Sequence, residues 1–173
     1  VTNNPTWNFL ANGYSNQYLV YGSIALDPNM TLSSNGFSNS IVTMFGNGLG
    51  GTSYTLKCAG KAWPNGTFST SLFSTDTVTL VDDFIGSSNC AFSTTGVFNA
   101  NNFNVTAKSF GGSATVFMGT GIWDMIGAGT IWNPSGTIFP SSSTIKISDG
   151  TTTGKTFAGG GKTYNNLLIS GAG

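Results

Sequence analysis

The stretches Thr77-Val78-Thr79-Leu80-Val81 and Ser143-Thr144-Ile145-Lys146-Ile147 alternate polar and apolar residues almost without exception. Successive side chains of a β-strand point to opposite faces, so this alternation predicts strands with one buried and one solvated face. A helix would instead need apolar residues at a period near 3.6, with capping residues at its ends. No segment of the chain has that pattern.

Short β-prone runs of the same kind, separated by Gly, Asn, Ser and Pro, recur roughly every 8–12 residues. We expect strands at residues 17–24, 41–45, 53–57, 66–72, 77–82, 96–98, 103–107, 114–118, 121–125, 130–132, 144–147, 155–158 and 166–170. The pattern predicts an all-β protein with short strands and Gly- and Asn-rich turns. This spacing suits a stacked β-sandwich, a barrel and a β-helix or other solenoid equally well.

A weak internal repeat favours the solenoid. When the chain is displaced by about 101 residues, residues 54–56 (YTL) face 155–157 (KTF), residues 59–63 (AGKAW) face 160–164 (GGKTY), and Phe9 faces Phe110. We therefore expect one β-rich unit at residues 1–72, connecting strands at 73–101 and a second unit at 102–173, within one continuous domain. The chain begins at Val1 and stops within the pattern at Gly173, so we expect it to be processed or part of a longer protein.

The charge composition argues against several functions. Only 7% of the residues are charged, against about 25% in an average globular protein, and six Lys balance six Asp with no Arg, Glu or His. A neutral surface without Arg gives no reason to expect nucleic-acid binding. No run approaches the roughly 18 apolar residues of a membrane span. We expect neither partner.

An enzymatic role finds little support in the residues. Acid–base chemistry usually relies on His or a tuned carboxylate, and only six Asp are present. Asp82 and Asp83 are adjacent and on a strand would point to opposite faces, although distant Asp residues can still meet across coils. The glycine runs at 46–51 and 159–162 lack phosphate-loop spacing, and Asp149-Gly150 is a poor calcium site, so we interpret all three as turns. We predict no enzyme, no cofactor and no metal.

Two cysteines and four tryptophans offer more specific candidates. Cys58 and Cys90 either form a disulfide that closes a loop of about 30 residues or remain two buried thiols. The tryptophans are best interpreted as core or protein-contact residues. Trp63, which precedes Pro64, is our first candidate for an exposed contact, followed by Trp132 and Tyr164.

Several stretches resemble the repetitive β-rich proteins of phage and environmental viral genomes. They are residues 99–110 (NANNFNVTAKSF), 118–123 (MGTGIW), 130–132 (TIW), 143–149 (STIKISD) and 155–167 (KTFAGGGKTYNNL). The resemblance covers residues from about 78 to 173. It implies a right-handed β-helix, a structural or tail-associated role, a virion or cell-surface location and a homo-oligomer, with a trimer as our guess.

The sequence therefore leads to one main functional prediction and two alternatives. We expect a non-enzymatic structural protein of a virion or cell surface, such as a capsid decoration, fibre or tail component, that contacts other virion or surface proteins. The first alternative is a carbohydrate-binding or adhesin module in which Trp63 and Trp132 stack on sugar rings. The second is a polysaccharide-cleaving β-helix.

Overall fold

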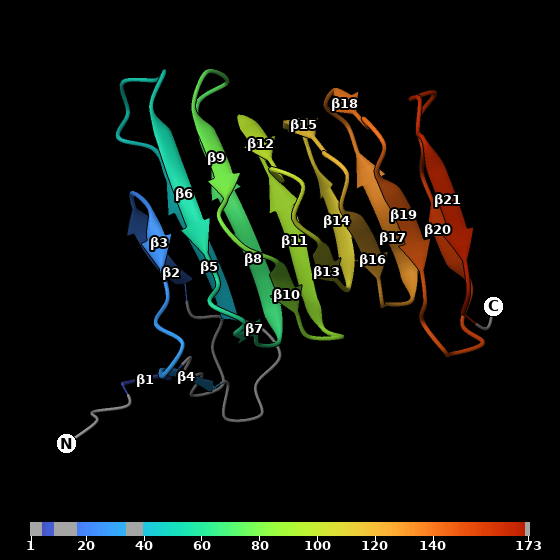
Figure 1. Cartoon of the computed structure of the whole chain (residues 1–173), viewed down its shortest axis with the longest axis horizontal. Coiled ribbons are helices and arrows are strands. Elements are labelled where there is room, and N and C mark those ends of the chain that lie inside the picture. The colour runs from blue at the N-terminus through green and yellow to red at the C-terminus, as the bar shows by residue number, and fades with distance from the viewer. Residues whose placement is uncertain (1–4, 9–16, 34–39, 172–173) are drawn as a thin grey trace.

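A computed structural model describes residues 5–8, 17–33 and 40–171 of the chain. These residues form only strands, turns and bends, and every strand pair is parallel. The chain winds into a β-solenoid of seven coils, with up to three strands in each coil, so the all-β, solenoid-like prediction is confirmed (Figure 1). Every strand lies beside its counterpart in the next coil, which satisfies the backbone hydrogen bonds along the stack.

The strands form three long sheets and one short pair. Sheet I has seven strands: β2 (Gln17–Tyr21), β5 (Ser40–Phe45), β8 (Gly66–Ser71), β11 (Cys90–Thr94), β14 (Ser109–Gly112), β17 (Gly129–Pro134) and β20 (Lys155–Phe157). Sheet II has six: β3 (Ile24–Ala25), β6 (Ser53–Lys57), β9 (Thr77–Leu80), β12 (Val97–Asn99), β15 (Thr115–Phe117) and β18 (Ile138–Phe139). Sheet III also has six: β7 (Ala62–Trp63), β10 (Phe84–Gly86), β13 (Val105–Ala107), β16 (Ile122–Met125), β19 (Thr144–Ile147) and β21 (Asn166–Ile169). The separate pair is β1 (Thr6–Asn8) and β4 (Thr31–Ser33).

The structural repeat is a single coil of variable length. Ser40 pairs with Gly66, 26 residues further on, whereas Ala91 pairs with Ser109, 18 residues further on. The offset of about 101 residues is therefore not the repeat of this fold. It aligns β5 of sheet I with β19 of sheet III, and its pairing of Phe9 with Phe110 lies outside the described residues. Sheet I runs without interruption past residues 72 and 101.

The alternating stretches behave as their pattern predicts. Val78 and Leu80 of β9 are fully buried, as is Ile145 of β19, while the polar residues between them face outward. Strands β10, β11 and β14 were not among those expected. They lie in Phe84–Gly86, Cys90–Thr94 and Ser109–Gly112, where Gly and Ser are frequent and β-propensity is low. Pairing with neighbouring coils outweighs that local preference.

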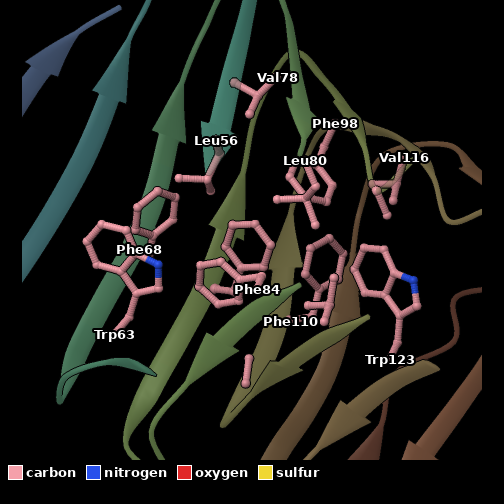
Figure 2. Close-up of a cluster of buried hydrophobic side chains, with 14 of the residues drawn as sticks. Leu56, Trp63, Phe68, Val78, Leu80, Phe84, Phe98, Phe110, Val116 and Trp123 are labelled. Carbon is pink, nitrogen blue, oxygen red and sulfur yellow. The ribbon is translucent and has the colours of Figure 1, made fainter. Parts of the chain in front are cut away.

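Aromatic residues fill the interior in ladders. In sheet I, the inward positions of successive coils carry Phe68, Phe92, Phe110, Trp132 and Phe157 in register. Their neighbouring ring centroids lie 5.0–6.0 Å apart. Side chains from all three sheets meet around this ladder (Figure 2). Each buried ring contributes roughly 1.5–3 kcal/mol through burial, so the core is continuous and apolar.

The first coil covers one end of this core. Trp7 of β1 packs edge-on against Trp63, with ring centroids 6.3 Å apart, and against Tyr18 at 6.1 Å. The β1–β4 pair is not hydrogen-bonded into sheet III, yet it occupies the same place in its coils as the sheet III strands do in theirs (Figure 1). The aromatic packing therefore extends to the N-terminal coil.

Candidate contact surfaces

Trp63 is part of the core, so the prediction that it forms an exposed contact is wrong. Its side chain is 1% exposed, and its ring lies 4.6 Å from that of Phe68 and 6.5 Å from that of Phe84. The indole N–H donates to Sγ of Cys58 at 3.3 Å. Pro64 does follow Trp63 at the end of β7, but the turn begins after the ring has already entered the interior. Sequence position alone gave no sign of this.

Trp132 and Tyr164 meet at the other end of the stack. Trp132 is fully buried and its indole N–H donates to the Tyr164 hydroxyl at 3.0 Å, while that hydroxyl donates to the carbonyl of Gly159 at 3.0 Å. Burial raises the pKa of Tyr164. Trp132 therefore cannot stack on a sugar ring, and Tyr164 serves to close the last coil. The interpretation of the tryptophans as core residues is confirmed for Trp63, Trp123 and Trp132.

The two cysteines are free and buried, so the disulfide is not formed. Cys58 Sγ accepts the hydrogen bond from Trp63, and Cys90 Sγ packs over the α-carbon of Gly86 in sheet III. Burial raises the pKa of each thiol to about 12. Both sulfur atoms therefore act as small apolar groups of the core, which is the other alternative left open by the sequence.

Every aspartate of the chain accepts a hydrogen bond that fixes a turn or links neighbouring coils. Asp82 accepts the backbone N–H groups of Cys58 and Ala59 in the preceding coil, at 2.6 and 2.5 Å. Asp83 instead accepts from the backbone and side-chain nitrogens of Asn104 in the following coil, at 2.8 and 3.1 Å. The other donors are Asn29 N–H to Asp27, Thr52 N–H to Asp76, Lys146 Nζ to Asp124 and Lys155 Nζ to Asp149.

The outer face of sheet III carries the most polar surface, which we call the sheet III strip: Asp83, Asn104, Asp124 and Lys146. Register places Asp124 directly beside Lys146, and the two side chains form an ion pair at 2.9 Å. The strip lines a shallow depression of about 340 Å³. Asp83 and Asp124 belong to strands two coils apart, about 10 Å along the solenoid axis. The depression thus brings together two of the aspartates, each already hydrogen-bonded.

The glycine runs form turns, as expected. Gly48, Gly50 and Gly51 all have positive φ in the loop between β5 and β6. The N–H of Lys162 bonds to the carbonyl of Gly159 at 3.1 Å and closes the second turn. Asp149 lies in the segment after β19, where the hydroxyl of Thr151 and the ammonium of Lys155 lower its pKa. No group of three potential metal ligands occurs within the described ranges.

An exposed aromatic pair lies on the outer face of sheet II. Phe117 of β15 and Phe139 of β18 stack with centroids 4.8 Å apart and planes 7° apart, and they are 41% and 47% exposed. Neither residue was a candidate in the sequence analysis. The signal was present, because Thr115-Val116-Phe117 and Thr137-Ile138-Phe139 repeat one pattern and place each Phe on the outward side.

The fold and these surfaces define a parallel β-solenoid with a filled aromatic interior. Comparison with protein-family models, with curated proteins and with solved structures gives no match. Among residues 5–8, 17–33 and 40–171 there is no helix long and apolar enough to cross a membrane.

Proposed function

We propose that the chain is a non-enzymatic structural module of a virion or cell surface, which acts through protein–protein contacts and assembles as a homo-oligomer. The observation that carries the proposal is the use of the carboxylates. All six aspartates, which are the only acids in the chain, accept hydrogen bonds that hold turns or tie one coil to the next.

Two further features support a structural role. The interior is packed with side chains, and the ring ladder links successive coils into one stiff unit. The outer faces carry solvent-exposed aromatic side chains, including Tyr21, Phe117 and Phe139. Exposed aromatic residues contribute most per residue to protein–protein contacts.

The location and the chemistry are tested separately. Quantitative mass spectrometry of purified particles, washed cell surface and cytosol should find the protein enriched in the particle or surface fractions. The purified protein should release no reducing ends from a panel of polysaccharides, and Asp83→Asn and Asp124→Asn should alter only its thermal stability. A purely cytosolic protein would contradict the location, and polysaccharide cleavage abolished by Asp124→Asn would contradict the structural role.

A carbohydrate-binding module is a second candidate, supported by a different surface from the one first expected. The sheet III strip presents an amide, two carboxylates and an ammonium around a depression of about 340 Å³, which suits hydrogen bonding to hydroxyl groups. A glycan array tests it: specific binding lost in Asn104→Ala and retained in Phe139→Ser would favour this candidate. An array without binding would remove it.

A further inference from the structure

Sheet II stops one coil short of its neighbours. It ends at β18, whereas sheets I and III continue in the next coil to β20 and β21. Between those two strands the chain carries Gly159-Gly160-Gly161, and Gly160 and Gly161 have φ values of 59° and 68°. Glycines in this conformation turn the backbone instead of extending it. Within the described residues, β18 therefore has β15 on one side and no strand on the other.

The backbone of Ile138 points to this open side. Val116 pairs with Ile138 in parallel register, and the N–H groups of Val116 and Met118 donate to the carbonyls of Thr137 and Phe139 at 2.8 and 3.0 Å. Successive residues of a strand direct their N–H and C=O groups to opposite edges. The N–H and C=O of Ile138 therefore face away from β15, where an added strand would bond to them.

A groove follows this open edge, and we call it the β18 groove. It has a volume of about 450 Å³ and lies between one segment of β18 and the glycine turn. Its lining residues are Ser135, Gly136, Thr137, Ile138, Gly160, Gly161, Lys162 and Thr163. Lys162 is the only charged residue among them, which favours an occupant with a carboxylate.

The stacked phenylalanines indicate what an added strand would carry. Phe117 and Phe139 occupy paired positions of neighbouring strands, and their rings stack along the solenoid axis. A strand that continued this register would place an outward side chain over the free side of Phe139. An aromatic residue there would extend the stack, and such pairs contribute about 0.5–1.5 kcal/mol beyond burial.

We propose that the β18 groove binds an extended segment of a partner polypeptide as a seventh, parallel strand of sheet II. The segment carries an outward aromatic residue over Phe139 and an acidic residue near Lys162. Main-chain hydrogen bonds to Ile138 give the affinity and the aromatic position gives the selectivity, as in other cases of strand addition. This inference rests on the proposed role in protein–protein contacts and specifies one such contact.

Fluorescence polarisation with a labelled peptide, Glu-Gly-Thr-Ile-Phe-Glu, tests the site. We expect saturable binding that weakens about tenfold in Phe139→Ser, in Lys162→Glu, and when Ser replaces the peptide Phe. Methylation of the peptide backbone nitrogens should abolish binding, because strand addition needs those donors. Phe117→Ser is the matched control, since this residue is equally exposed in the same stack but lies one strand away from the groove, and it should change the affinity much less.

Three results would overturn the assignment: no binding of the peptide, equal binding of the Ser peptide, or full displacement of the peptide by a saccharide. The failure of this site is distinguishable from the failure of the proposed function. A protein that is enriched in particles or on the cell surface but does not bind the peptide would retain its structural role and lose only this contact.

Discussion

The indole nitrogen of Trp63 lies 3.3 Å from Sγ of Cys58, deep in the core. The indole N–H is a donor that must find an acceptor once buried, and the sulfur atom supplies one. We therefore expect both thiols to be present and inaccessible in the native protein. Ellman's reagent at pH 8 should label neither Cys58 nor Cys90 in buffer and both after unfolding in urea. Recovery of no thiol after unfolding would instead indicate a disulfide.

The raised thiol pKa values predict a loss of stability at alkaline pH. Folding raises the pKa of each thiol from 9.0 to about 12, so the unfolded chain releases these protons at lower pH than the folded chain does. The contribution is complete below pH 9 and is lost as the pH rises from 9 to 12. Urea unfolding across this range should show a steeper decline for the native protein than for the Cys58→Ala/Cys90→Ala variant. Parallel curves would contradict the burial of the thiols.

Thr94 offers a stabilising substitution. Its hydroxyl is buried and has no hydrogen-bond partner, which costs free energy that an isosteric apolar group avoids. Thr94→Val should raise the free energy of unfolding by about 1 kcal/mol and the melting temperature by about 2–4 °C. Thr43→Val is the control, because that hydroxyl bonds to Ser69 Oγ at 2.8 Å and its loss should destabilise the protein. Equal effects of the two substitutions, measured by calorimetry, would contradict this account.

The fold class was predictable because the period of two is a local property of the strand. Val78 and Leu80 announce their buried face within four residues of sequence. The coil is not a local property, since its length varies from 18 to 26 residues between paired positions. A fixed offset therefore aligned strands of different sheets. Strand β11 escaped notice for a related reason: Phe92 is its only large apolar residue, and the ladder above and below it provides its stability.

The contact surfaces were harder to predict, because burial of an aromatic residue depends on neighbours in other coils. Trp63 and Phe139 both lie in two-residue strands, yet Trp63 is 1% and Phe139 47% exposed. Two residues are too few for an alternation to show which of them faces inward. The difference arises from the register with the preceding coils, which places Phe139 on the outward row of Phe117.

Gly112 is expected to resist substitution. Its φ is 106°, and a Cβ atom there would lie 2.1 Å from the carbonyl oxygen of Thr94 in the paired strand. Gly112→Ala should therefore cost about 3 kcal/mol or prevent folding, since backbone strain and a backbone clash combine. Gly51→Ala is the control: its φ is 71° but no atom lies within 4 Å of the added carbon, so only strain of about 1–2 kcal/mol is expected. Chemical denaturation should rank the two variants in this order, and the reverse order would contradict the close approach of the coils.

Asp82 holds the most demanding turn of the stack. Its two carboxylate oxygens accept the N–H groups of Cys58 and Ala59, and Ala59 adopts a positive φ of 51° that alanine rarely takes. Charge-assisted bonds of this kind contribute about 1.5–3 kcal/mol, so Asp82→Ala should lower the free energy of unfolding by at least 2 kcal/mol. Asp82→Asn keeps one acceptor oxygen and should recover part of the loss.

The matched control for Asp82 is Asp27→Ala, which removes a single bond to the N–H of Asn29 in an exposed turn and should cost less than about 1 kcal/mol. Because Asp82 connects the coil of Cys58 to its own coil, its loss should also speed hydrogen exchange at Cys58 and Ala59, whereas Asp27→Ala should leave those amides protected. If both variants unfold at the same urea concentration, the carboxylate does not hold the turn. Its position would then be a consequence of the packing of Cys58 and Trp63 and not a cause of it.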